Sequence, residues 1–192
     1  MARRTKAEAQ ATRALILDAA EQVFHAQGVS HASLAEVAKA AGVSRGAIYW
    51  HFENKIDLFQ AMLERLRLPL EELARASESE DEPDPLGCMR ELLIKALTRL
   101  ACDPQTCRLH DILRYKCEYT GELVGLRERM QALSLECDQR IAKALSNAVN
   151  KGQLPSDLDC QRAAVCLHAY MEGIEANWLL VPHFDLEQQA PA

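Results

Sequence analysis

Two short amphipathic segments with helix-capping residues follow a longer one at the start of the chain, and this pattern restricts the fold more than any other feature. Apolar residues recur at helical spacing over 9–27, and Gly28 follows at the position of a helix C-cap. Ser33 and Glu36 then match the capping-box pattern at the head of a second helix over 34–41. The chain is therefore predicted to open with helices that have defined ends.

A third short helix is predicted over 45–52, directly after a tight turn at 41–43. Gly42 ends the second helix, and Ser44 is an N-cap candidate for the third. Two short helices joined by such a turn form a helix-turn-helix, whose second helix enters the major groove in proteins that bind DNA. Residues 1–54 are therefore interpreted as a three-helix DNA-binding domain.

The remainder of the chain also follows helical periods. Further helices are predicted over 55–70, 85–101, 104–117, 120–151 and 160–181. Pro69 predicts a kink or break in the first of these, Gly152 ends the fourth, and Asp159 caps the last. The acidic segment 77–84 has no apolar period and is interpreted as an exposed loop. Because aromatic residues make up only 5% of the chain and alternating β-branched runs are scarce, the predicted fold class is all-α, with a larger helical-bundle domain over 55–192.

The charge distribution favours nucleic acid at one end of the chain only. The net charge is −6, yet residues 1–56 hold seven Lys/Arg against five Asp/Glu, a net charge of +2. Arg3, Arg4 and Lys6 precede the helical pattern, as an arm that contacts phosphates would. The basic end is therefore the one that carries the helix-turn-helix.

Seven widely spaced cysteines, none in a Cys-x-x-Cys pair, are typical of a reducing compartment. No apolar signal segment opens the sequence, and no apolar run approaches the roughly 20 residues that a membrane span requires. We therefore expect a cytoplasmic protein that does not associate with a membrane.

Residue types in the predicted third helix divide by helical spacing. Ala47, Ile48 and Phe52 fall on the side of the core, and the other side chains point elsewhere. These other residues are Arg45, Gly46, Tyr49, Trp50 and His51. Large aromatic side chains are usually buried, so an exposed Tyr-Trp pair indicates a surface for a partner. A small three-helix subdomain with an aromatic core is the alternative interpretation.

The chemistry of these side chains suits DNA. Arg45 can donate two hydrogen bonds to guanine in the major groove, and Gly46 permits close approach. Tyr49 and His51 can donate to phosphate oxygens, and Lys55 adds a phosphate contact together with the backbone N–H groups of the next helix. The predicted DNA-contacting residues are Ser33, Ser44, Arg45, Gly46, Tyr49, Trp50, His51 and Lys55.

Residues 12–59 resemble the DNA-binding domain of the TetR family of transcriptional repressors, most specifically in the motif GVSRGAIYWHF-x-NK. The phrases ARASESEDEPDPLGCMRELL, ILRYKCEYTGE, QRAAV and NWLLVP extend the resemblance over nearly the whole chain, to multidrug-efflux repressors of the AcrR and TtgR type. Such proteins place two recognition helices about one DNA turn apart on a palindromic operator. The resemblance therefore implies a homodimeric repressor that drug-like molecules release from double-stranded DNA, that controls an efflux pump and that affects antibiotic resistance.

The resemblance also implies how two subunits associate. In the family, the last two long helices of each subunit pack as a four-helix bundle. Similar proteins continue past the equivalent of PHFDL into a further amphipathic helix, whereas this sequence ends at Ala192. Whether the chain is naturally short or a truncated product, we expect its dimer to be weaker.

A ligand-binding cavity within 55–192 is a further implication of the resemblance. Helical spacing alone identifies two polar pairs that share a helix face, His110 with Arg114 and His168 with Glu172, although a lone histidine is more often an ordinary hydrogen-bonded side chain. The family positions that line the cavity correspond to Leu66, Leu92, Leu93, Ala96, His110, Arg114, Cys137, Ile141, His168, Met171 and Glu172. A buried Glu172 is expected to pair with Arg114, with His168 or with a cationic ligand. The implied ligands are small hydrophobic or aromatic molecules such as antibiotics, plant phenolics and dyes.

Two other classes of function compete with this interpretation. A thiol-based redox-responsive regulator would use some of the cysteines, although cysteine is also a common small core residue. Its candidates are Cys88, Cys102, Cys107, Cys117, Cys137, Cys160 and Cys166. An enzyme is the second class, but the sequence lacks a glycine-rich phosphate loop, a Gly-x-Ser-x-Gly elbow and a His-Glu-x-x-His motif, so no catalytic residue is predicted. No Cys or His pair has structural zinc spacing, and no metal or cofactor is expected.

Overall fold

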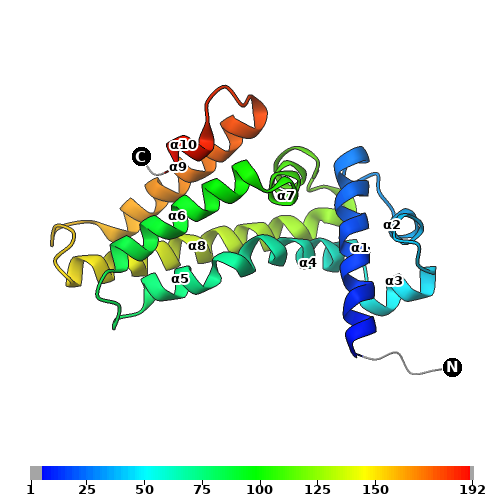
Figure 1. Ribbon diagram of the computed structural model, residues 1–192, viewed down its shortest axis with the longest axis horizontal. Coiled ribbons are helices and arrows are strands. Elements are labelled where there is room, and N and C mark those ends of the chain that lie inside the picture. Colours follow the sequence, from blue (N-terminus) through cyan, green and yellow to red (C-terminus); the bar gives the residue numbers. More distant parts are fainter. Residues whose placement is uncertain (1–5, 191–192) are drawn as a thin grey trace. The chain divides into compact units, whose positions relative to one another are not determined.

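The computed structural model describes residues 6–190, and every regular element in that range is a helix (Figure 1). The helices are α1 (Lys6–Gln27), α2 (Leu34–Ala40), α3 (Arg45–His51), α4 (Lys55–Arg67), α5 (Glu71–Glu78), α6 (Pro85–Cys102), α7 (Pro104–Tyr115), α8 (Val124–Asn150), α9 (Cys160–Leu180) and α10 (Leu186–Gln189), with 3-10 turns η1 (Leu68–Leu70) and η2 (Gly121–Leu123). The predicted all-α class is confirmed, since no strand occurs within 6–190. None of the described helices has both the length and the apolar character needed to cross a membrane.

The described chain forms two compact units, each built from two separate stretches. Unit 1 comprises residues 6–66 and 108–126, and unit 2 comprises residues 67–107 and 127–190. The predicted division into a DNA-binding domain (1–54) and a helical-bundle domain (55–192) separates functions, not compact units. This division stays a prediction.

Unit 1 is organised around an aromatic and aliphatic core that joins α1 to α4. The rings of Phe24 and Phe59 lie 6.4 Å apart between centroids, and both side chains are almost fully buried. Ile16, Val37 and Ile48 bring α1, α2 and α3 to the same core, where each is fully buried. Burial of such side chains contributes about 1.5–3 kcal/mol each, so this core holds the three N-terminal helices together.

The predicted ends of the N-terminal helices agree with the structure. Gly28 and Gly42 follow α1 and α2 with positive φ angles of 82° and 66°, a backbone conformation that glycine adopts without steric cost. The start of α1 differs from the prediction, because the helix begins at Lys6 and this residue therefore belongs to a helix rather than to an arm. Arg3 and Arg4 lie outside the described residues.

The end of α7 and the segment after it pack on the N-terminal helices within unit 1. The backbone N–H of Val29 donates to the carbonyl oxygen of Lys116 at 2.8 Å. Nε2 of His25 on α1 lies 3.3 Å from a carboxylate oxygen of Asp111 on α7. Ile112 of α7, Leu123 of η2 and Leu126 at the start of α8 are fully buried. Residues 108–126 are thus an integral part of the unit that carries the helix-turn-helix.

The α-helix is interrupted at Pro69, where the sequence predicted a kink or break. The α-helix α4 ends at Arg67, a 3-10 turn contains Pro69, and α5 follows. The predicted acidic loop 77–84 is wrong at its first two residues, which close α5 instead. Ser77 is buried, and its polar groups have partners: its hydroxyl donates to the carbonyl oxygen of Ala74 at 2.8 Å, and its carbonyl oxygen accepts from the side-chain amide of Asn147 at 3.4 Å.

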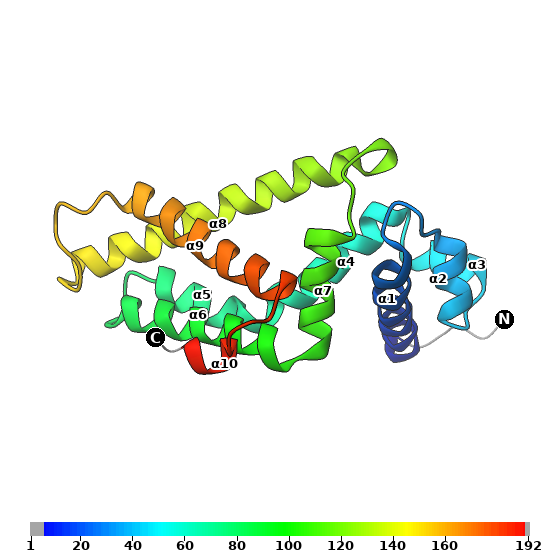
Figure 2. The same ribbon diagram turned by 90° about the horizontal axis from the view of Figure 1, so that it is seen from above.

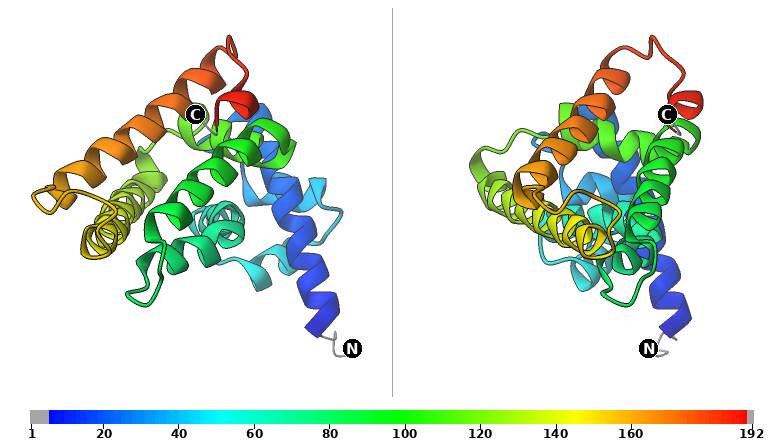
Figure 3. Two further views of the ribbon diagram at one scale, coloured as in Figure 1. Left: turned by 60° about the vertical axis from the view of Figure 1, so that its left-hand side comes forward. Right: turned by 90° about the vertical axis from the view of Figure 1, so that its left-hand side faces the viewer.

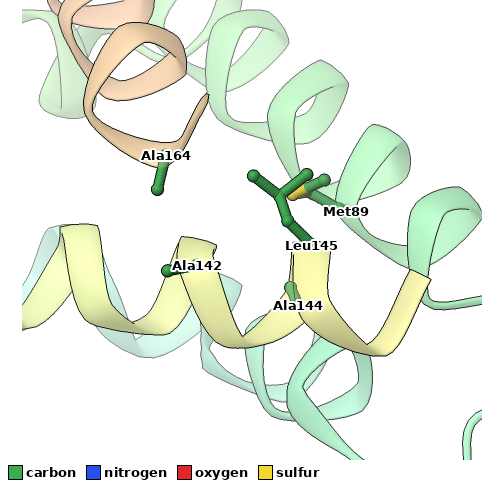
Figure 4. Close-up of a cluster of buried hydrophobic side chains, with 5 residues drawn as sticks. All are labelled: Met89, Ala142, Ala144, Leu145 and Ala164. Carbon is green, nitrogen blue, oxygen red and sulfur yellow. The ribbon is translucent and has the colours of Figure 1, made fainter. Parts of the chain in front are cut away.

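Unit 2 holds two separate apolar clusters. The first joins Met89 of α6 to Ala142 and Leu145 of α8 and Ala164 of α9 (Figure 4). Its small residues permit close approach of the helices. The second cluster is formed by Leu97, Leu100 and Leu186, which places α10 beside the C-terminal half of α6 (Figure 2). Helix α5 runs alongside α6 over the other end of that helix (Figure 3).

Several predicted helix ends in the C-terminal half are corrected by the structure. Helix α7 ends at Tyr115 rather than at 117, and α8 begins at Val124 after a 3-10 turn rather than at 120. Asp159 caps α9 as predicted, accepting a hydrogen bond from the backbone N–H of Arg162 at 3.0 Å. This helix is not the last one, because α10 follows Pro182.

A partly buried ion-pair network in unit 2 connects α5 to α8. Arg140 donates from Nε to Glu78 at 2.6 Å and from Nη1 to Glu71 at 3.2 Å. The hydrogen bond from Arg140 holds the pKa of Glu71 below its ordinary value of 4.5. The folded state therefore favours the ionised form of Glu71.

We expect Glu71→Gln to reduce the acid sensitivity of the fold. Since the pKa of Glu71 is lower in the folded than in the unfolded chain, its ionised form stabilises the fold above the ordinary value of 4.5, and this stabilisation is lost as the pH falls toward the folded pKa. Urea unfolding at several values between about pH 6 and pH 3 should show a smaller loss of unfolding free energy in the variant. Glu72→Gln, at the exposed neighbouring position, is the control; equal slopes for both variants would contradict the prediction.

Candidate functional site

Helix α3 has a buried face and an exposed face. Ile48 and the C-cap residue Phe52 are buried in the core, with exposed fractions of 0% and 1%. Tyr49 and Trp50 are 52% and 72% exposed, although both are large and aromatic. The spacing argument thus identified the inner and outer faces of this helix, and the outer face includes Arg45 at its first residue.

His51 departs from the predicted outward group. Its side chain is half-buried, and its ring packs edge-on against Trp50 with 4.5 Å between centroids. It also lies 6.2 Å from the ring of Phe52. His51 therefore packs against the exposed indole of Trp50. A phosphate contact by His51 stays a prediction.

Two of the predicted DNA-contacting serines form helix caps. The Ser44 hydroxyl accepts a hydrogen bond from the backbone N–H of Ala47 at 3.1 Å. Ser33 completes a capping box with Glu36, whose carboxylate accepts from the Ser33 backbone N–H at 2.8 Å. Hydrogen bonds from the Ser33 hydroxyl and backbone hold the pKa of Glu36 below its ordinary value. Both serines fix where α2 and α3 begin, and direct DNA contact by them stays a prediction.

Ser33→Ala is expected to lower the unfolding free energy by about 1 kcal/mol, because the first turn of α2 loses the hydroxyl that satisfies one of its backbone N–H groups. Chemical denaturation of the purified chain measures this loss. Ser33→Thr keeps a capping oxygen and should retain most of the stability. Losses of equal size in both variants would mean that the cap is not the cause.

The structure revises the role expected of Lys55. Its side chain is only 9% exposed, and Nζ donates to the carbonyl oxygens of Val29 at 2.9 Å and Ser30 at 3.2 Å. The ammonium group thus ties the start of α4 to the turn after α1 instead of extending toward a phosphate. A phosphate contact by Lys55, together with the backbone N–H groups of the first turn of α4, stays a prediction.

The predicted ligand-contacting positions divide between the two units. Leu66, His110 and Arg114 belong to unit 1. The remaining positions are in unit 2, on α6 (Leu92, Leu93, Ala96), α8 (Cys137, Ile141) and α9 (His168, Met171, Glu172). Leu93 and Ile141 pack against the first apolar cluster of unit 2, and Met171 packs against the second. These three positions thus lie at apolar clusters of unit 2, and a shared ligand site stays a prediction.

A polar group missed by sequence reasoning lies among these positions. Nδ1 of His168 on α9 is 2.7 Å from Oδ1 of Asp138 on α8. Nε2 of His168 is 4.0 Å from Oε1 of Glu172, the pairing that the i,i+4 spacing suggested. The Glu172 side chain is 53% exposed, so it is not the buried carboxylate for which a cationic partner would be required. Asp138 follows the predicted Cys137 directly, but an isolated acidic residue on a long helix gives no signal of its own.

The cysteines offer little support for a redox sensor. All seven lie among the described residues, and none is in a disulfide. Burial raises the pKa of Cys88 and Cys137, and raises that of Cys117 to about 11. A hydrogen bond with Glu187 raises the pKa of Cys102. Because the thiolate is the reactive form, these four thiols are poorly suited to oxidation at neutral pH.

A metal site is likewise not indicated by the described residues. Within 6–190, no group of three or more His, Cys, Asp or Glu side chains is arranged to hold a metal ion.

Comparison with known proteins gives a consistent assignment over both parts of the chain. Residues 16–62 match the family described as bacterial regulatory proteins, tetR family, and residues 84–192 match the C-terminal region of MAATS-type transcriptional repressors. The HTH-type transcriptional regulator TtgR of Pseudomonas putida is 52% identical, over 95% of this chain and 87% of TtgR.

Two solved structures are similar along most of their length. NalD, the secondary repressor of the MexAB-OprM multidrug efflux pump in Pseudomonas aeruginosa, has a TM-score of 0.83 and 36% identity, over 96% of this chain and 92% of NalD. The complex of SmeT with triclosan has a TM-score of 0.85 and 34% identity, over 95% of this chain and 88% of SmeT. Given the family matches and the 52% identity to TtgR, this chain is a transcription regulator and not an enzyme, and it belongs to the TetR family.

Proposed function

We propose that this protein is a repressor that binds a palindromic operator as a homodimer and leaves it when a small hydrophobic molecule binds. The observation that carries the proposal is the outer face of α3. A seven-residue helix exposes Arg45, Gly46, Tyr49 and Trp50 while Ile48 anchors its other face in the core.

This face has the features of a recognition helix. Residues at the N-terminus of such a helix approach base edges, and Arg45 is the first residue of α3. Its guanidinium can form two hydrogen bonds with guanine, and no side chain at Gly46 obstructs the approach. The hydroxyl of Tyr49 and the indole N–H of Trp50 are donors that suit phosphate oxygens.

The dimer interface is assigned to an apolar surface on α8 and α9. Leu135, Val165 and Tyr170 are 62%, 53% and 65% exposed, which is unusual for side chains of this size. We propose a second copy of the chain as the partner, because a palindromic operator requires two recognition helices related by two-fold symmetry. Isologous packing of this surface would bury these side chains in both subunits.

The effector is proposed to be a small hydrophobic or aromatic compound held by the predicted ligand-contacting positions of unit 2. The similar structure of SmeT is a complex with triclosan, and the similar protein NalD is a repressor of a multidrug efflux pump. By similarity we propose that this chain regulates an efflux pump. The mechanism is a population shift: a ligand that binds more tightly to the conformer with unsuitable spacing of the recognition helices lowers the affinity for DNA.

The test is selection of operators from random palindromic DNA, followed by fluorescence-anisotropy titration with and without planar hydrophobic drugs and plant phenolics. Specific binding that weakens in the presence of a drug supports the proposal. Sedimentation of the complex should show two chains on each operator. Failure to select any sequence, with a dimeric and folded protein, would overturn the proposed function.

A further inference from the structure

Four side chains of unit 1 form a continuous series of ring contacts that ends at the most exposed aromatic residue of α3. The guanidinium carbon of Arg13 on α1 lies 5.2 Å from the centroid of the Phe52 ring. The ring centroids of Phe52 and His51 are 6.2 Å apart, and those of His51 and Trp50 are 4.5 Å apart. The contact series therefore consists of Arg13, Phe52, His51 and Trp50.

Burial decreases along the contact series from Phe52 to Trp50. Phe52 is 1% exposed, and its backbone N–H donates to the carbonyl oxygen of Ile48 at 2.9 Å, so core packing and the helix cap both fix it. His51 is half-buried, and Trp50 is 72% exposed. Each ring is thus supported by a neighbour that has less freedom to move.

The contact between Trp50 and His51 depends on a specific orientation of the indole. Consecutive side chains of an α-helix point about 100° apart around its axis, so they do not normally face each other. Here the planes of the two rings are 87° apart, which is the edge-to-face arrangement that aromatic rings favour. The contact therefore selects one orientation for a side chain that is largely surrounded by solvent.

Arg13 joins the contact series from a different helix. Helix α3 ends beside the N-terminal half of α1 (Figure 1), and the guanidinium of Arg13 lies over the Phe52 ring within the range of a cation–π contact. A planar guanidinium stacks well on an aromatic face. The stack thus links the end of α3 to α1 at the ring on which the outer members of the series depend.

We propose that Arg13 is a positioning residue for operator binding, which acts through Phe52 and His51 to hold the indole of Trp50 in one orientation before DNA arrives. An indole N–H that is already in place donates to a phosphate oxygen without the entropy loss of ordering a mobile side chain. This inference rests on the proposed function, because it assumes that α3 contacts an operator. It adds a residue of α1 that serves recognition without touching DNA.

The mobility of the indole can be measured directly, because the chain has only two tryptophans. Trp178→Phe, at a position that packs against the second apolar cluster of unit 2, leaves Trp50 as the single indole. Time-resolved fluorescence anisotropy of the full chain in this background should show little decay within about a nanosecond, the timescale of exposed side-chain motion. Arg13→Ala should enlarge this fast decay, and Arg13→Lys, which keeps a cation near the ring, should give an intermediate decay.

Operator affinity shows whether this order serves recognition. Arg13→Ala should weaken binding of a selected operator about tenfold, because each subunit of the dimer must then order its indole on binding. In a Trp50→Ala background the same change should have less than about a twofold effect, since the two residues act together. Arg90→Ala on α6 is the control, and it should leave the Trp50 decay unchanged and alter the affinity by less than about threefold.

Circular dichroism establishes that each variant is folded. If Arg13→Ala does not fold, Arg13→Lys serves in the same comparison, with an expected loss of affinity of about threefold.

The dependence of affinity on salt separates positioning from direct contact with DNA. A positioning residue leaves the slope of log affinity against log salt unchanged, whereas loss of one phosphate contact in each subunit lowers the slope by about 1.8. A lower slope with an unchanged Trp50 decay would assign Arg13 to a phosphate contact and overturn the inference. Equal losses of affinity in the presence and in the absence of Trp50 would overturn it as well.

Failure of this inference differs from failure of the proposed function. If the wild type binds a selected operator and Arg13→Ala changes neither the affinity nor the Trp50 decay, the inference fails and the repressor function stands. If a folded, dimeric wild type selects no operator, the proposed function fails, and a positioning role in operator binding fails with it.

Discussion

Arg45→Ala is expected to reduce the affinity for the selected operator by at least about thirtyfold. Loss of a bidentate contact with guanine costs about 1–3 kcal/mol, and a symmetric dimer loses the contact in both half-sites. Because Arg45 is exposed at the start of α3, its removal should leave the melting temperature unchanged. Anisotropy titrations at fixed ionic strength measure the change, since salt alone alters affinity for DNA.

A matched variant separates sequence recognition from bulk charge. Arg90→Ala removes the same charge from an exposed position on α6 and should change the affinity by less than about threefold. A second comparison uses operators with the contacted base pair replaced, which Arg45→Ala should no longer distinguish from the original. If Arg45→Ala and Arg90→Ala weaken binding equally, α3 does not read the sequence through Arg45.

Arg65→Leu is expected to destabilise unit 1 by about 3–5 kcal/mol. Nη1 of Arg65 on α4 lies 2.5 Å from Oε1 of Glu21 on α1, and the Glu21 side chain is only 2% exposed. The same guanidinium reaches Asp18 at 2.6 Å and the carbonyl oxygen of Ala14 at 3.1 Å. Its removal leaves a buried carboxylate without the cation that compensates its desolvation.

Urea unfolding followed by circular dichroism measures this loss, and two variants identify its cause. Glu21→Gln combined with Arg65→Leu removes the buried charge as well, so it should recover most of the stability. Arg67→Leu breaks an exposed pair with Glu136 and should cost less than about 1 kcal/mol. A double variant no more stable than Arg65→Leu would show that packing of the arginine stem, rather than charge, is responsible.

The sequence was most informative where structure depends on nearby residues. The capping box of Ser33 and Glu36, the cap at Ser44 and the glycines after α1 and α2 each involve residues within four positions of one another. Such local hydrogen bonds can be recognised from spacing alone. For the same reason the inner and outer faces of α3 were predicted from its period.

Contacts between distant residues account for most of what could not be predicted. Lys55 bonds to carbonyl groups 25 and 26 residues earlier in the chain, and Asp138 bonds to His168 across 30 residues. Neither partnership has a signature in spacing, because it depends on how helices pack in space. The exposed fraction of Glu172 likewise depends on how its helix packs, which spacing alone does not give.

The two-stretch construction of unit 1 has a consequence for how this regulator can be made and rearranged. During synthesis, the hydrogen bond from Val29 to Lys116 cannot form until residue 116 has been made. The core of unit 1 stays incomplete until Leu126 has left the ribosome. A fragment that ends at residue 54 or 66 would lack the buried Ile112 and Leu126. We therefore expect the helix-turn-helix of unit 1 to keep its stability on another effector domain only when residues 108–126 are included.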